Sequence, residues 1–83
     1  MATWRKLLQK AVDETGDAYT ETTLSEKDLD RKFSDGYGGS QGKPFTAWGD
    51  KYVYFPVVYD GAEWVGWAPR NPCDEPTRHQ GGE

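Results

Sequence analysis

The chain has 83 residues, 35% apolar and 14% aromatic, and its fourteen acidic and ten basic side chains give a net charge of −4. A single Cys and a single His exclude an internal disulfide and a closed four-ligand zinc site. The sequence pI near 4.9 argues against direct binding to nucleic-acid phosphates or to anionic membranes.

Residues 3–16 are predicted to form an amphipathic helix. Thr3 is a suitable N-cap, and Gly16 is a suitable C-terminal stop. Because the first turn is basic and the last is acidic, these charges oppose the helix dipole, so packing must hold the helix in place. The apolar face repeats every 3.6 residues and consists of Trp4, Leu7, Leu8, Ala11 and Val12.

A second, shorter helix is predicted over residues 26–33. Ser25 is its expected N-cap, and Asp28 stands three residues later, which nearly matches a capping box. Leu24 and Leu29 have the spacing of a hydrophobic staple. A helix of this length does not persist alone in water, so it must pack on the rest of the domain.

Residues 45–68 are predicted to form a meander of three antiparallel strands, over 45–48, 51–59 and 62–68. The dipeptide Asp60-Gly61 is a strong signal for a two-residue hairpin turn, because such turns need positive φ at both positions. This turn fixes the register, which pairs Tyr59 with Ala62, Val57 with Trp64 and Phe55 with Gly66.

Pro56 interrupts the middle strand of this meander. Its missing N–H would point toward the first strand, where a ladder bond would be lost. A loop of three or four residues places Pro56 opposite about Lys43-Pro44. The first strand is therefore predicted to be short and to stop pairing before it reaches Pro56.

Both faces of the predicted sheet are apolar, and two short helices can cover only one of them. The uncovered face is a candidate interaction surface; the alternative is that the loop and the tail fold over it. Tyr54 and Trp67, cross-strand neighbours in this register, are expected on the less covered face. One face carries Val53, Phe55, Val57, Tyr59 and Trp64, and the other carries Phe45, Ala47, Tyr52, Tyr54, Val58, Val65 and Trp67.

Three segments are predicted to be irregular: a Thr-rich acidic connection over 17–24, a glycine-rich loop over 34–43, and a proline-rich tail over 71–83. The fold class is therefore α+β, with the two helices packed on the three-stranded sheet. Residues 1–70 form a single domain, and the tail follows it.

Several motifs suggest chemistry and fail on inspection. The glycine-rich stretch is not a phosphate-binding loop, because Tyr37 replaces its first glycine and Pro44 its Ser or Thr. Cys73 and His79 lie in the tail, where nothing orients them as a nucleophile and base. Carboxylate pairs such as Asp74-Glu75, or Asp28 with Asp30, have little cleft to act across. No enzymatic activity, cofactor or metal is expected.

Residues 13–30 concentrate seven acidic side chains against Lys27 alone, a local charge of −6. Fixed carboxylates can imitate phosphates and dock on a basic partner, although acidic patches ordinarily serve solubility. The predicted partner-binding residues are these acids together with the two aromatic anchors: Asp13, Glu14, Asp17, Glu21, Glu26, Asp28, Asp30, Tyr54 and Trp67.

The stretch DGYGGSQGKPFTAW and the run FPVVYDGAEWVG, together spanning residues 35–66, resemble a group of small proteins encoded by tailed bacteriophages and prophages. The opening TWRKLL…ETGD and the tail PRNPCDEPTRHQGG fit the same group, so the resemblance covers nearly the whole chain. The group has no assigned activity and lends no functional residues. The resemblance implies an accessory protein that binds and redirects or blocks a bacterial host protein.

The leading functional hypothesis is a non-enzymatic modulator or inhibitor of a bacterial host protein, one of defence or nucleic-acid handling, acting in the cytoplasm of the infected host. No signal-like or membrane-spanning apolar segment is expected. One alternative is a structural or virion protein that self-associates as a homodimer or larger. A second is a small-ligand binder that uses the glycine-rich loop as a lid.

Overall fold

The structure is a computed structural model that describes residues 2–33, 42–59, 62–73, 75–77 and 79. Helix α1 spans Trp4–Thr15, and its predicted ends are confirmed. The Thr3 hydroxyl accepts the Lys6 N–H, while Gly16 has φ +73° and donates its N–H to the Val12 carbonyl. Positive φ suits glycine, which has no Cβ to clash with the preceding carbonyl.

Helix α2 spans Glu26–Asp30 and has the predicted capping box. The Ser25 hydroxyl accepts the Asp28 N–H, and the Asp28 carboxylate accepts the Ser25 N–H. The predicted extension to Phe33 is wrong. Phe33 instead exchanges two backbone hydrogen bonds with Ala2, at 2.8 and 2.9 Å. This bridge satisfies the backbone outside a helix and buries the Phe33 ring.

The sheet has four antiparallel strands in the order β1-β2-β3-β4: Glu21–Thr22, Ala47–Trp48, Tyr52–Tyr59 and Ala62–Pro69. The α+β class is confirmed, but the expected three-stranded sheet gains β1 from the segment predicted to be a connection. The Thr20 N–H donates to the Trp48 carbonyl, and the Thr23 N–H donates to the Thr46 carbonyl. These two bonds extend the pairing between β1 and β2. A two-residue strand has no alternation of polar and apolar positions, so periodicity does not reveal it.

The predicted register of β3 against β4 is confirmed, with Phe55 opposite Gly66. The turn dipeptide Asp60-Gly61 lies outside the described residues. Strand β2 pairs only through Ala47 and Trp48, so it is as short as Pro56 predicted. Continuing that register places Pro56 opposite Phe45, slightly beyond the expected position.

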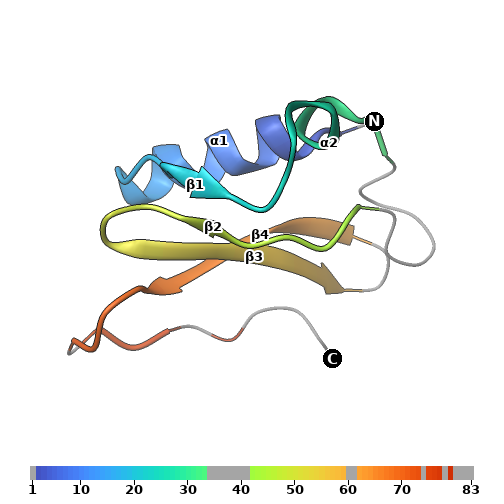
Figure 1. The fold of residues 1–83 in the computed structure, drawn as a ribbon. Helices are drawn as coiled ribbons and strands as arrows, with labels where there is room; N and C mark the ends of the chain where they lie inside the picture. Colours follow the sequence, from blue (N-terminus) through green and yellow to red (C-terminus); the bar gives the residue numbers. More distant parts are fainter. Residues whose placement is uncertain (1, 34–41, 60–61, 74, 78, 80–83) are drawn as a thin grey trace.

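Both helices lie on one side of the sheet, as Figure 1 shows. The core between these two layers is centred on Trp4, which is 1% exposed. The centroids of the Phe33 and Phe45 rings each lie 4.8 Å from that of the Trp4 ring, and the Trp4 Nε1–H donates to the Lys43 carbonyl at 3.0 Å. The buried cluster consists of Ala2, Trp4, Leu8, Ala11, Leu24, Leu29, Phe33, Phe45, Ala47, Tyr54 and Val65.

The described tail residues, 71–73, 75–77 and 79, are exposed and belong to no helix or strand. One side chain ties this segment to the sheet: the Tyr52 hydroxyl donates to the Glu75 carboxylate at 3.1 Å. The boundary between a domain over 1–70 and a tail over 71–83 stays a prediction.

Candidate functional site

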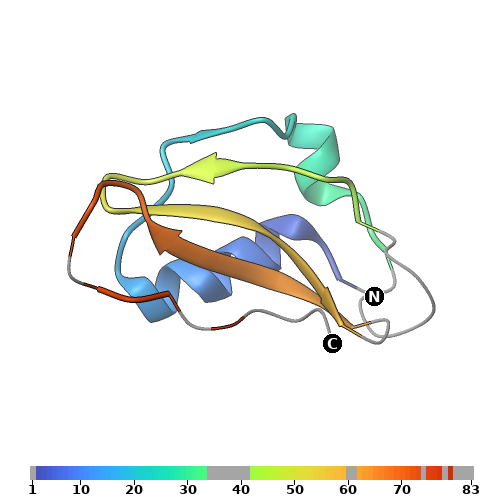
Figure 2. The ribbon, with the colours of Figure 1, turned by 90° about the horizontal axis from the view of Figure 1, so that it is seen from below.

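One face of the sheet is not covered by either of the two helices that the structure describes. Figure 2 views the sheet from this side, with the described tail segments running beside β4. We call this surface the open face. Strand pairing places on it Trp48 of β2, Val53, Phe55, Val57 and Tyr59 of β3, and Ala62, Trp64, Gly66 and Ala68 of β4. None of them belongs to the buried cluster or packs against it.

The open face is apolar along all of its described positions in β2, β3 and β4. Phe55 and Trp64 are half-buried, and Tyr59 is 45% exposed. The side chains on this face that are at least partly exposed include those of Trp48, Val53, Phe55, Tyr59 and Trp64, whereas Val57 is buried. Surfaces of this composition are typical of interaction sites.

The expected placement of Tyr54 and Trp67 on the less covered face is wrong. Tyr54 is fully buried, and Trp67 packs against the core on the helix side. The Tyr54 hydroxyl donates to the Asp17 carbonyl and lies 2.7 Å from the Thr15 hydroxyl. Burial raises the pKa of Tyr54, with the Asp17 charge contributing. Tyr54 therefore joins the end of α1 to the sheet, and its side chain is not accessible to a partner.

Asp17 was predicted as a partner-binding residue, but it is only 8% exposed and works inside the fold. Its carboxylate accepts hydrogen bonds from three backbone N–H groups where the chain turns from β2 into β3, those of Asp50, Lys51 and Tyr52, at 3.2, 2.9 and 3.0 Å. These bonds, that of Lys51 foremost, hold the pKa of Asp17 below its ordinary value, although burial opposes them. Asp17 thus fixes the turn that aligns β2 with β3.

Gly49 makes room for this carboxylate. A Cβ at this position would lie 2.3 Å from Asp17 Oδ2 and 3.0 Å from the Ala18 carbonyl oxygen. We expect Gly49→Ala to lower the free energy of unfolding by about 1–3 kcal/mol, because the carboxylate must move away from its donors. Urea denaturation measures the loss. In an Asp17→Ala background, Gly49→Ala should lower the free energy of unfolding by a smaller amount. An equal decrease there would show that displacement of the Asp17 carboxylate is not the cause.

Three more of the predicted acidic residues are also engaged within the fold. Arg5 of α1 binds Glu26 and Asp30 of α2, with Nε 2.7 Å from Asp30 Oδ1. The hydrogen bond to Asp30 and, to a lesser extent, the one to Glu26 raise the pKa of Arg5. The same contact with Arg5 lowers the pKa of Asp30. Asp28 serves the capping box and pairs with Lys43 at 3.0 Å, and both contacts lower its pKa. The acidic segment is therefore not one free negative surface.

The remaining predicted acids, Asp13, Glu14 and Glu21, are exposed. Asp13 accepts a hydrogen bond from Gln9 one turn earlier in α1, at 2.9 Å. The side chains of Glu14 and Glu21 form neither an ion pair nor a hydrogen bond with the described residues. They lie on different elements, the end of α1 and strand β1.

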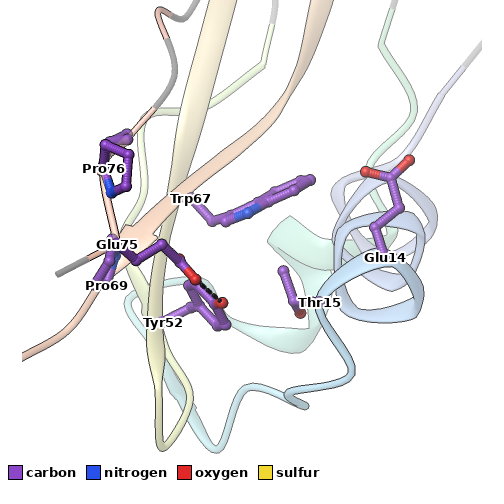
Figure 3. Close-up of a pocket in the computed structure, with 8 residues that line it drawn as sticks. Glu14, Thr15, Tyr52, Trp67, Pro69, Glu75 and Pro76 are labelled. Carbon is purple, nitrogen blue, oxygen red and sulfur yellow. Dashed lines mark hydrogen bonds between the residues drawn. The ribbon is translucent and has the colours of Figure 1, made fainter. Parts of the chain in front are cut away.

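A pocket of about 280 Å³ lies between the end of α1, the helix side of β3 and β4, and the tail. Figure 3 shows the Trp67 indole between Glu14 on one side and Glu75 on the other, with the Tyr52 hydroxyl bonded to Glu75. The sequence alone does not predict this pocket, because the pocket joins residues that are far apart in the chain. It is lined by Glu14, Thr15, Tyr52, Trp67, Pro69, Glu75, Pro76 and Thr77.

The other chemistry-bearing residues are dispersed. Cys73 is a free, exposed thiol. Among the described residues, no three His, Cys, Asp or Glu side chains gather as metal ligands, and no helix is long and apolar enough to cross a membrane. Residues 34–41, most of the proposed loop lid, lie outside the described residues, while Gly42 N–H donates to the buried Glu63 at 3.0 Å.

No family model, curated protein or solved structure matches the chain.

Proposed function

We propose that the chain is a non-enzymatic interaction domain that docks on another protein through the open face of its sheet. The observation that carries this proposal is the group of half-buried aromatic side chains of Trp48, Phe55 and Trp64 on a face that no described element covers. Rigid aromatic side chains at the centre of such a patch contribute most of the binding energy in protein interfaces.

The size of the open face supports a docking role. β3 and β4 pair over eight residues each, roughly 27 Å at about 3.4 Å per residue. With β2 at its side, the open face forms one continuous apolar surface, and surfaces of this kind often serve as interaction sites. A partner that also contacts the rim completes an interface of small to standard size.

The partner that we propose is a bacterial host protein. This choice follows from the resemblance to accessory proteins of tailed phages, and the action would be to modulate or block that protein in the host cytoplasm. Electrostatic docking through residues 13–30 becomes a lesser contribution, because Asp17, Asp28 and Asp30 already serve contacts within the fold. Substitutions of Glu14 and Glu21 test this electrostatic contribution.

The test compares substitutions on the two faces of the sheet. We expect Phe55→Thr with Trp64→Thr to reduce capture of the partner from bacterial lysate by about thirtyfold, because two anchors are lost while threonine keeps β-propensity. Val58→Thr is the matched control, since Val58 is 39% exposed on the opposite face. Quantitative pull-down at low and high salt measures capture, and circular dichroism verifies folding.

Two outcomes would contradict the proposal. One is undiminished capture by the double variant. The other is an equal loss for Val58→Thr, which would place the contact on the wrong face. Salt-sensitive capture that falls in Glu14→Gln and Glu21→Gln would restore the acidic contribution.

A second candidate, self-association, is favoured by β4. It is an eight-residue strand at the edge of the sheet and contains no Lys, although Pro69 ends it. Long apolar edge strands pair readily with another copy. Light scattering during size-exclusion chromatography distinguishes this case, because a dimer has twice the 9.4 kDa mass of the chain. A monomer at all concentrations would exclude it.

A further inference from the structure

The pocket beside Trp67 combines an aromatic wall with two carboxylates. Trp67 and Tyr52 come from neighbouring strands, and their side chains lie on the helix side of the sheet. Glu14 reaches the pocket from the end of α1, and Glu75 reaches it from the tail. Three separate segments therefore bring negative charge and a π-face to one concave site.

The negative charge of this pocket is not neutralised within the described structure. Among the described residues that line it there is no Lys or Arg. Within the described part of the chain, the Glu14 side chain has no partner and the Glu75 carboxylate accepts a hydrogen bond from the Tyr52 hydroxyl alone. That bond, followed by burial and the charge of Glu75, raises the pKa of Tyr52. The site is thus electrostatically prepared for a positive charge.

We propose that this pocket binds a guanidinium group, with its plane against the Trp67 ring and its N–H groups directed to Glu75, while Glu14 adds negative charge beyond the other end of the indole. A guanidinium stacks on aromatic rings and donates planar pairs of hydrogen bonds to carboxylates. A pocket of about 280 Å³ lies just below the range of drug-sized ligand sites, so it suits one side chain or a small cation.

This proposal is independent of docking through the open face, because the pocket lies on the other side of the sheet. A guanidinium can come from a free small molecule or from an arginine side chain of a peptide. Two probes distinguish these sources: N-acetyl-arginine amide and the peptide acetyl-Gly-Arg-Gly amide. The matched controls replace arginine by citrulline, which has nearly the same shape without the charge.

The measurement is a titration followed by the indole N–H signals in ¹H–¹⁵N correlation spectra, with the Trp67 signal assigned through Trp67→Phe. We expect it to shift and saturate with a Kd of about 1 mM or tighter for an arginine probe, and at least tenfold weaker for its citrulline analogue. Saturation by the free derivative identifies a small-molecule site, and saturation by the peptide alone identifies a partner side chain.

The carboxylates are tested separately. Glu75→Gln should weaken binding about three- to fivefold, as expected for an exposed charge pair, and Glu14→Gln should weaken it less because its charge acts over a longer distance. Glu21→Gln is the control, since Glu21 is an exposed acid outside the pocket. Equal binding of citrulline probes, no Trp67 shift with either arginine probe, or unchanged binding in both pocket variants would each overturn the proposal. Loss of open-face docking would not affect these results.

Discussion

Replacing Trp4 by alanine is expected to unfold a large fraction of the protein. Removing a buried tryptophan from a core costs about 3–5 kcal/mol, and a chain of this length has roughly 4–12 kcal/mol in total. Trp4 is 1% exposed, contacts the rings of Phe33 and Phe45, and donates to the Lys43 carbonyl. It therefore joins α1, the segment after α2 and the segment before β2, and its loss releases all three.

Urea denaturation followed by circular dichroism measures this effect. Trp64→Ala is the control, because Trp64 is half-buried on the open face and outside the core cluster. Trp4→Phe should fall between the two, since it keeps a ring but leaves the Lys43 carbonyl without its donor. If Trp4→Ala lost no more stability than Trp64→Ala, the core would not be centred on Trp4.

The second large effect is expected for Asp17→Asn. The amide can present one oxygen to Lys51 and Tyr52, but its NH₂ group then faces the N–H of Asp50, so two donors oppose each other. A lost charge-assisted bond and an unsatisfied donor should lower Tm by at least about 5 °C. Differential scanning calorimetry measures the shift, and Glu21→Gln, which loses no described hydrogen bond, should leave Tm unchanged.

The same substitution should alter the response to acid. The pKa of Asp17 is lower in the folded state than its ordinary value, mainly because of the Lys51 N–H bond. Its stabilisation is therefore complete above the unfolded pKa, about 3.9, and is lost as pH falls through the lower folded value. Asp17→Asn should flatten the fall in stability below about pH 4. An equally steep fall would assign the acid response to Asp28 and Asp30, whose pKa values are also lowered.

The site itself was predicted only in part from the sequence. Alternation along the strands separated the two sets of side chains correctly, and the shortage of helix implied that one set stays uncovered. The side of the sheet on which α1 packs decides which set stays uncovered. The prediction that Tyr54 and Trp67 lie on the uncovered face was wrong. A contact between a helix at residues 4–15 and a strand at residues 62–69 is long-range, so no local pattern specifies it.

The acidic residues illustrate the same limit. Their number and spacing indicated a negative surface, yet Asp17 is turned inward onto a loop more than thirty positions away. Arg5 lies 21 and 25 positions before the two acids that it binds. The glycine at position 49 was a usable signal, since a glycine after a short strand often marks a close approach of another group.

The sequence alone determined the local features: the ends of α1, the capping box of α2, the register of β3 with β4, and the short pairing of β2 before Pro56. Each depends on residues within a few positions, through caps, turn geometry or a missing N–H. Tertiary structure decided the rest: strand β1, the covered face, the inward role of Asp17 and the pocket beside Trp67. These depend on which distant segments share the small core, because burial and pairing there are gained only once the whole chain has folded.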